Sequence, residues 1–139
     1  MIFIDTNYFV RALTAPVTDE EERMAAAAVA LFRNVSTGQV LATTSDAVIA
    51  EVAYVLTGRG FQLTREDVAS ALERLFHLPG FKSEHVNTWT LALHLWLSRR
   101  SLSLVDALGA AYSMREGHEL ATFDRRLTRH PGLNAYLSE

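Results

Sequence analysis

Met1-Ile2-Phe3-Ile4-Asp5-Thr6-Asn7 opens the chain with an apolar run that ends in an acid. A continuous apolar run is typical of a strand that is buried on both faces of a parallel sheet. In such sheets, ligands bind outside the carboxyl ends of the strands, which is where the acid falls. Leu120-Ala121-Thr122-Phe123-Asp124 repeats the arrangement near the end of the chain. We therefore predict strands at Ile2–Asp5 and Leu120–Asp124, each ending in an Asp at the ligand-binding edge.

The composition fits one domain that covers residues 1–139. The chain has 139 residues, of which 49% are hydrophobic, which is enough for a core and argues against disorder. Cysteine is absent, which excludes disulfides, thiolate zinc sites and cysteine nucleophiles. No apolar run is long enough to cross a bilayer, and the N-terminus lacks the basic region of a signal peptide. We expect a soluble, cytoplasmic protein with no membrane partner.

Helix-start signals divide the chain into helices that alternate with short strands. Capping boxes lie at Thr18–Glu21 and Thr64–Asp67, and Ser45 and Ser103 are further cap residues. With the breaks at Gly and Pro, they predict helices at about 7–13, 18–35, 45–57, 64–78, 84–99 and 103–116, and strands at 2–5, 40–43 and 120–124, with a short edge strand near Phe81. This alternation predicts an α/β fold with a short, mostly parallel central sheet flanked by helices.

The charged residues give two opposing indications about nucleic acid. The formal net charge of −3 argues weakly against a protein that binds nucleic acid by bulk charge. Of the 13 basic residues, however, only Lys82 is a lysine. Arg suits phosphate because its planar group donates two hydrogen bonds, although a bias in genome composition explains the same excess.

Four acids are the candidate functional residues: Asp5, Glu51, Asp106 and Asp124. Clustered carboxylates are hard oxygen ligands that suit Mg²⁺ or Mn²⁺, and the ion removes the repulsion among them. Asp5 and Asp124 each end a predicted strand, but each also precedes a helix or turn, where Asp is a favoured N-cap. Both interpretations stay open for either residue alone, and the repetition at two strand ends favours the metal site.

Helical spacing distinguishes Glu51 from the other acid of its helix. Glu51 falls on the flank of the apolar stripe, whereas Asp46 falls on the opposite, solvent side. Asp106 heads a face of small residues, yet Ser103-Leu104-Val105-Asp106 is also a capping motif. We expect Glu51 and Asp106 to reach the strand ends, with a surface Glu and a helix-cap Asp as the alternatives.

Three polar residues beside the acids are candidate supporting groups. Thr6 and Asn7 follow Asp5 and offer a hydroxyl and an amide that can orient a carboxylate or a water. Thr122 lies two residues before Asp124, on the same face of the predicted strand. The five His residues show no metal-ligand spacing, and a solvated face is the default expectation for the Arg125-Arg126 pair.

In this order and with these neighbours, the four acids resemble the PIN-domain nucleases, and most closely the VapC-type toxins of toxin–antitoxin pairs. Ile4-Asp5-Thr6-Asn7 is similar to the family's opening motif, and Thr122-Phe123-Asp124 to its closing Thr-x-Asp. Glu51 corresponds to the acid of the third helix, and Asp106-Ala107-Leu108 to the third acidic motif. The resemblance spans essentially the whole chain.

The resemblance implies a Mg²⁺- or Mn²⁺-dependent endoribonuclease whose four acids hold one or two ions and cleave RNA phosphodiester bonds. It also implies a homodimer, and a cognate antitoxin that blocks the site. Two alternatives stay open. One is a PIN-like binding or regulatory module with little catalysis. The other is a phospho-acceptor domain, which is disfavoured because Asn7 stands where that class needs a second acid and a late Lys is missing.

Overall fold

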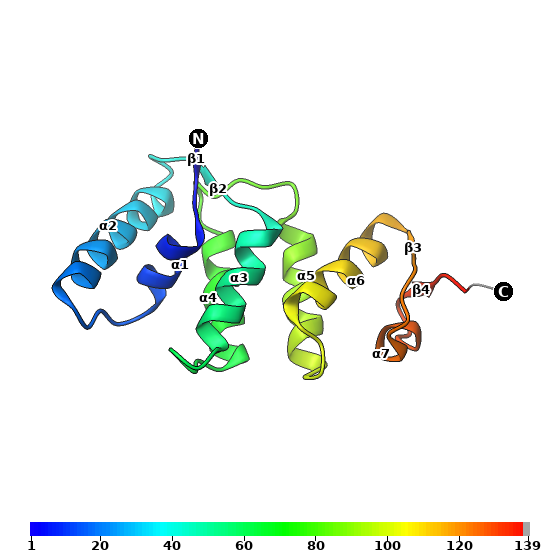
Figure 1. The fold of residues 1–139 in the computed structure, drawn as a ribbon. Coiled ribbons are helices and arrows are strands. Elements are labelled where there is room, and N and C mark those ends of the chain that lie inside the picture. Colours follow the sequence, from blue (N-terminus) through cyan, green and yellow to red (C-terminus); the bar gives the residue numbers. More distant parts are fainter. Residues whose placement is uncertain (138–139) are drawn as a thin grey trace. The chain divides into compact units, whose positions relative to one another are not determined.

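The structure is a computed structural model that describes residues 1–137, and within that range it contains seven helices and four short strands (Figure 1). Its contacts divide the chain into two units, Met1–Glu84 and His85–Glu139, each with buried apolar side chains of its own. The strands in each unit pair in parallel and are joined by helices. The predicted α/β class is confirmed. The strands that were expected in one central sheet form two parallel pairs among the described residues.

The sheet of the first unit pairs β1 (Ile2–Phe3) with β2 (Ala42–Thr43). The amide of Ile2 donates to the carbonyl oxygen of Leu41 at 2.8 Å, which fixes the parallel register. On its other side, Ala42 forms a parallel bridge with Phe81, so the edge strand that was predicted there consists of a single bridge. β2 is therefore paired on both sides.

β1 is shorter and more exposed than the sequence predicted. Ile2 is 42% exposed and Phe3 56% exposed, and burial begins at Ile4, which is 1% exposed. The expectation of a strand buried on both faces along 2–5 was therefore wrong for its first half. The chain becomes buried only at Ile4, just before the helix that starts at Thr6, and the first apolar side chains of the run stay exposed to solvent.

Four helices complete the first unit, each beginning where a side chain caps its free amides. Asp5, Thr18, Ser45 and Thr64 accept those hydrogen bonds. The helices are α1 (Thr6–Leu13), α2 (Asp19–Ser36), α3 (Asp46–Thr57) and α4 (Arg65–Phe76). α1 contacts both α2 and α3, and α3 contacts α4 (Figure 1). This arrangement fixes the start of α1 against the middle of α3.

The second unit is built on a helix pair. α5 (Val86–Ser98) packs along α6 (Leu104–Glu116) and buries Trp89 and Trp96, which are 1% and 3% exposed. Ala107 and Ala111 are fully buried, and such small side chains let the two helices approach closely. α6 ends at Gly117, whose φ of +70° is the left-handed conformation that favours glycine at a helix end.

A short parallel pair follows α6. β3 (Glu119–Leu120) pairs with β4 (Asn134–Ala135), and α7 (Arg125–Thr128) forms part of the crossover between them. Of the predicted strand Leu120–Asp124, only Leu120 lies in β3, so the prediction is wrong from Ala121 onward. Pairing stops at Leu120, and the chain turns so that Asp124 can cap α7. The local preference of Asp for an N-cap decides this segment.

Candidate active site

Asp5 lies where β1 runs into α1. It is the N-cap of α1, and its Oδ1 accepts a hydrogen bond from the amide of Thr6 at 2.8 Å. The side chain is exposed. The cap interpretation is thus confirmed, and it leaves the carboxylate at the surface, beside the buried Thr6.

Thr6 connects the start of α1 to the middle of α3. Its hydroxyl donates to Oε2 of Glu51 at 2.8 Å, across 45 residues of sequence. Thr6 is 6% exposed, so its hydroxyl is held by packing, and it in turn holds the exposed Glu51. The structure gives Thr6 a carboxylate-orienting contact of the kind that the sequence suggested.

The expected contrast between the two acids of α3 is not found. Asp46 is half-buried while Glu51 is exposed, which reverses the predicted order. Asp46 lies at the first position of α3, close to the capped end, where its surroundings enclose it more than the helical wheel suggested. Glu51 is therefore distinguished by its hydrogen bond with Thr6 and not by burial.

Asn7 lies at the other predicted supporting position of α1. It is exposed and lines a pocket of about 110 Å³ with residues of α1 and α2: Tyr8, Arg11, Met24 and Ala27. This places Asn7 beside α2. Its support of a carboxylate stays a prediction.

Asp106 forms a capping box with Ser103. The amide of Asp106 donates to Oγ of Ser103 at 3.1 Å, and the amide of Ser103 donates to Oδ2 of Asp106 at 3.2 Å. The Asp106 side chain remains 40% exposed. The capping alternative is therefore confirmed, while the carboxylate also stays available at the start of α6.

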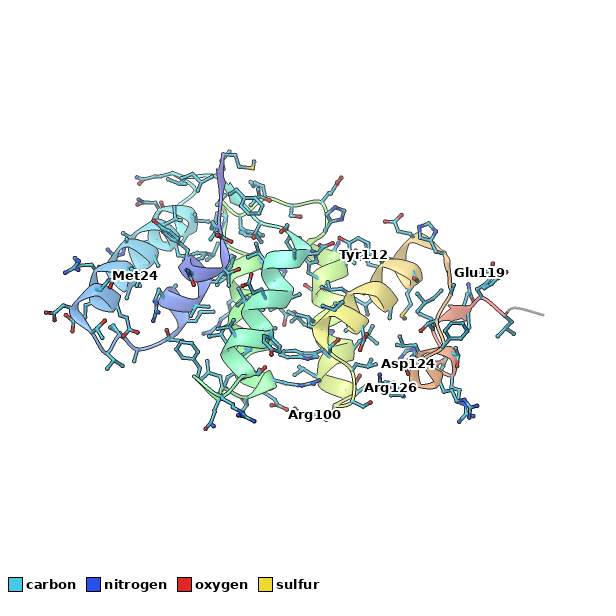
Figure 2. All side chains as sticks on the ribbon, in the orientation of Figure 1. Met24, Arg100, Tyr112, Glu119, Asp124 and Arg126 are labelled. Carbon is cyan, nitrogen blue, oxygen red and sulfur yellow. The ribbon has the colours of Figure 1, made fainter. Side chains whose placement is uncertain are left out.

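Asp124 is engaged by Arg126, two residues further on (Figure 2). Its Oδ1 accepts from the amide of Arg126 at 2.9 Å and from Nε at 2.8 Å, and its Oδ2 accepts from Nε at 3.0 Å and from Nη2. Nη2 also lies 4.0 Å from Oδ2 of Asp106. One guanidinium therefore holds two of the predicted acids.

This contact sets the electrostatics of the second unit. The hydrogen bond from the Arg126 side chain lowers the pKa of Asp124 below its ordinary value, and the Asp124 partner raises the pKa of Arg126. Each group stabilises the charged form of the other. The default expectation of a merely solvated Arg126 was wrong. The contact depends on the turn into α7, and the Asp-x-Arg spacing alone does not specify it.

Thr122 supports Asp124 through the backbone. Its hydroxyl accepts a hydrogen bond from the amide of Asp124 at 3.1 Å. The sequence suggested that this hydroxyl would meet the carboxylate, but that carboxylate turns toward α7 and Arg126 instead. Thr122 therefore fixes the turn that presents Asp124.

The four acids have the oxygen ligands that a divalent cation needs, and two of them already lie beside the positive charge of Arg126. All four acids offer oxygen ligands, which Mg²⁺ and Mn²⁺ prefer. In the second unit, Asp106 and Asp124 both lie against the Arg126 guanidinium. Within residues 1–137, no three His, Asp or Glu side chains gather closely enough to hold a metal ion by themselves. Two acids belong to each unit, and their meeting at one point stays a prediction.

Three of the four acids stand at helix starts, and carboxylates are the oxygen ligands that divalent ions take in metal-dependent hydrolases. Comparison with protein families matches residues 2–133 to the PIN domain. The chain therefore belongs to the PIN-domain family, whose members are generally nucleases that use divalent metal ions. The match spans both units. A comparison with curated proteins found no match. None of the helices between residues 1 and 137 has the length and apolar character needed to cross a membrane.

Proposed function

We propose that this chain is a Mg²⁺- or Mn²⁺-dependent endoribonuclease whose four acids, Asp5, Glu51, Asp106 and Asp124, together hold the metal. Membership of a nuclease family carries the proposal. Local geometry supports it in each unit. Thr6 fixes Glu51 beside the start of α1, and a single cation contacts both Asp106 and Asp124. Each unit therefore contributes one pair of carboxylates to the proposed site.

The chain's own residues have distinct tasks in this proposal. Asp5 and Asp124 present carboxylates from capped turns, and Asp106 does so from the first turn of α6. Thr6 orients Glu51 by its hydrogen bond. A bound divalent ion would activate a water and stabilise the charge that grows on the phosphate. Rigid caps suit the task because they hold the carboxylates in place before the ion arrives.

The biological setting that we propose is the toxin of a toxin–antitoxin pair. The support is the order of the motifs, which resembles that of VapC-type toxins throughout the chain. RNA as substrate, a cognate antitoxin and a homodimer belong to the same proposal. A small antitoxin-like reading frame just upstream of the gene would support the toxin role, whereas its absence would favour a housekeeping nuclease.

One observation favours a second candidate, a PIN-like binding or regulatory module. Both oxygens of the Asp124 carboxylate accept hydrogen bonds from Arg126, as they would in a protein that never takes up a metal. Such a module binds RNA but does not cleave it. The two candidate functions therefore differ in whether cleaved RNA is formed.

The test is cleavage of RNA by the pure protein with Mn²⁺ or Mg²⁺, with EDTA, and with Asp5→Asn. Asn keeps the N-cap of α1, so the variant is expected to fold while it loses a charged ligand. We expect cleavage only with the metal, and a loss in Asp5→Asn that exceeds the roughly 10–100-fold typical of a supporting residue. Asp19→Asn is the matched control, because Asp19 is an exposed acid in the first turn of α2.

Cleavage that persists in EDTA, or that is equal in Asp5→Asn and Asp19→Asn, would exclude the metal mechanism. RNA binding without cleavage under all conditions would favour the binding module.

A further inference from the structure

Arg126 occupies most of the hydrogen-bonding positions of the Asp124 carboxylate. An ionised carboxylate has about four lone-pair positions for hydrogen bonds or metal ions. Asp124 makes four hydrogen-bond contacts with three N–H groups of Arg126, which are the backbone amide, Nε and Nη2, and the single Nε hydrogen is shared between both oxygens. A divalent ion bonds to carboxylate oxygen at about 2.0–2.1 Å and needs one of these positions. The ion and the Arg126 side chain therefore compete for this carboxylate.

The same guanidinium also reaches the segment that leads into α6. Its Nη1 donates to the carbonyl oxygen of Ser101, and its Nη2 lies 4.0 Å from Oδ2 of Asp106. The side chain of Arg126, which belongs to α7, therefore lies beside both Asp106 and Asp124. The Arg126 side chain is 42% exposed, so it has solvent into which to move.

A displaced Arg126 would remain on a turn that carries two further exposed arginines. Arg125 and Arg129 are exposed on and just after α7, and Arg126 lies between them in the sequence. Phosphate matches the two-pronged geometry of a guanidinium as carboxylate does, so an arginine released by one finds a suitable partner in the other. Substrate RNA offers such a phosphate directly beside the metal.

We propose that Arg126 is a metal-displaced positioning residue, which occupies the Asp106–Asp124 pair until a divalent ion enters and then binds a phosphate of the RNA substrate. This inference rests on the proposed nuclease function. It predicts that Arg126 opposes metal binding and favours RNA binding only after metal binding. A purely structural arginine would do neither.

The experiment measures the dissociation constant of Mn²⁺ by calorimetry or electron paramagnetic resonance, in the absence of RNA. Arg126→Gln is expected to bind Mn²⁺ about fivefold more tightly than the wild type, the size of a good exposed ion pair. Arg125→Gln is the matched control, because it removes the same charge from the same turn. It should change the affinity by less than about twofold.

Arg126→Lys separates the displacement from simple charge. Lys keeps the positive charge but lacks the planar group that occupies both carboxylate oxygens. We expect Arg126→Lys to bind Mn²⁺ more tightly than the wild type as well. If Arg126→Lys equals the wild type, or if Arg126→Gln equals Arg125→Gln, the inference is wrong while the proposed function stands.

RNA binding is the second readout, measured with a cleavage-resistant RNA analogue whose linkages keep their negative charge, so that cleavage does not interfere and all four acids stay intact. With Mn²⁺ present, Arg126→Gln should weaken RNA binding more than Arg125→Gln does, and in EDTA the two should be equal. An equal effect in both conditions would overturn the proposed release. Absence of Mn²⁺ binding in every variant, Arg126→Gln included, would instead refute the metal-dependent function itself.

Discussion

At the scale of the residue, the hydrogen bond from Thr6 to Glu51 is the contact that most directly links packing to the proposed chemistry. The hydroxyl is buried with Thr6, and the carboxylate that it holds is exposed. Buried hydroxyls that orient metal ligands are typical of the supporting shell of metal sites. Thr6 therefore fixes the position of Glu51 from a buried place at the start of α1.

Thr6→Val tests this role because Val keeps the shape of Thr and removes only the hydroxyl. We expect the dissociation constant of Mn²⁺ to rise about tenfold in Thr6→Val. The free energy of unfolding should change by less than about 1.5 kcal/mol, because the lost bond joins a part-buried pair. Isothermal calorimetry and urea unfolding measure the two quantities.

Thr44→Val is the control, since that hydroxyl is also buried in the first unit but donates to the carbonyl oxygen of Ile4. It should lower stability without weakening Mn²⁺ binding to the folded protein. In a double-mutant cycle, Thr6→Val should have no further effect once Glu51→Gln is present. A full additional loss in that background would mean that Thr6 acts by another route.

The four acids could be proposed from sequence because Asp5, Asp106 and Asp124 stand at helix starts, and Glu51 was proposed from its place beside the apolar stripe of α3. Arg126 could not, because an arginine two residues after an Asp has many possible contacts. Its four hydrogen bonds to Asp124 depend on the turn into α7, which only the folded backbone defines. Side-chain exposure was equally hard to predict, as Asp46 shows.

At the scale of the element, helix starts were predicted well and strands poorly. The caps at Thr18, Ser45, Thr64 and Ser103 all form as predicted, because a cap is decided within four residues. The strands have only two residues each, and their pairing depends on segments far away in the sequence. No local pattern specifies which partner they find.

The backbone passes so close to Gly80 that only glycine, which has no side chain, fits next to β2 at this position. A Cβ there would overlap the carbonyl oxygen of Val40 and come within 2.7 Å of that of Val35. The amide of Gly80 also donates to Val35, and its carbonyl accepts from Ala42. The close approach lets the 80–82 segment pair with β2.

Gly80→Ala should therefore lower the free energy of unfolding by about 1–3 kcal/mol or more, since rigid backbone must move. Gly60→Ala is the control in the same unit, with no atom within 4 Å of the added Cβ, and should stay within about 0.5 kcal/mol. Gly109 lies inside α6 with equally open space, so Gly109→Ala should raise the free energy of unfolding by about 0.5–1 kcal/mol.

Urea unfolding measures the free energy of unfolding of all three variants. Equal losses in Gly80→Ala and Gly60→Ala would contradict the packing argument.

At the scale of the whole molecule, the open question is cooperativity between the two units. The sequence predicts one domain over residues 1–139, and the PIN family match from 2 to 133 runs through both units. Length and composition suggested a single domain, but they do not indicate whether the two units unfold together or separately.

The tryptophans make this coupling measurable. Trp89 and Trp96 are the chain's two tryptophans, and both are buried in α5 of the second unit. Fluorescence therefore reports on that unit, whereas far-ultraviolet circular dichroism reports on the helices of both. For one domain, we expect the two signals to share one urea midpoint.

Leu72→Ala sharpens the comparison, because Leu72 is fully buried in α4 of the first unit. The cavity should cost about 2–5 kcal/mol and shift the fluorescence midpoint as much as the dichroism midpoint. A fluorescence midpoint that does not move would show that the units unfold separately and that the one-domain prediction is wrong.

The bond between Arg126 and Asp124 also has a kinetic consequence. A guanidinium does not lose its proton in proteins, and Arg126 lowers the pKa of Asp124, so at neutral pH the two groups separate only by movement of a side chain. Rotations of exposed side chains take picoseconds to nanoseconds. The displacement of Arg126 that we propose is a side-chain movement that needs no slower rearrangement of the backbone. We therefore expect Arg126 to change how much metal is bound at equilibrium.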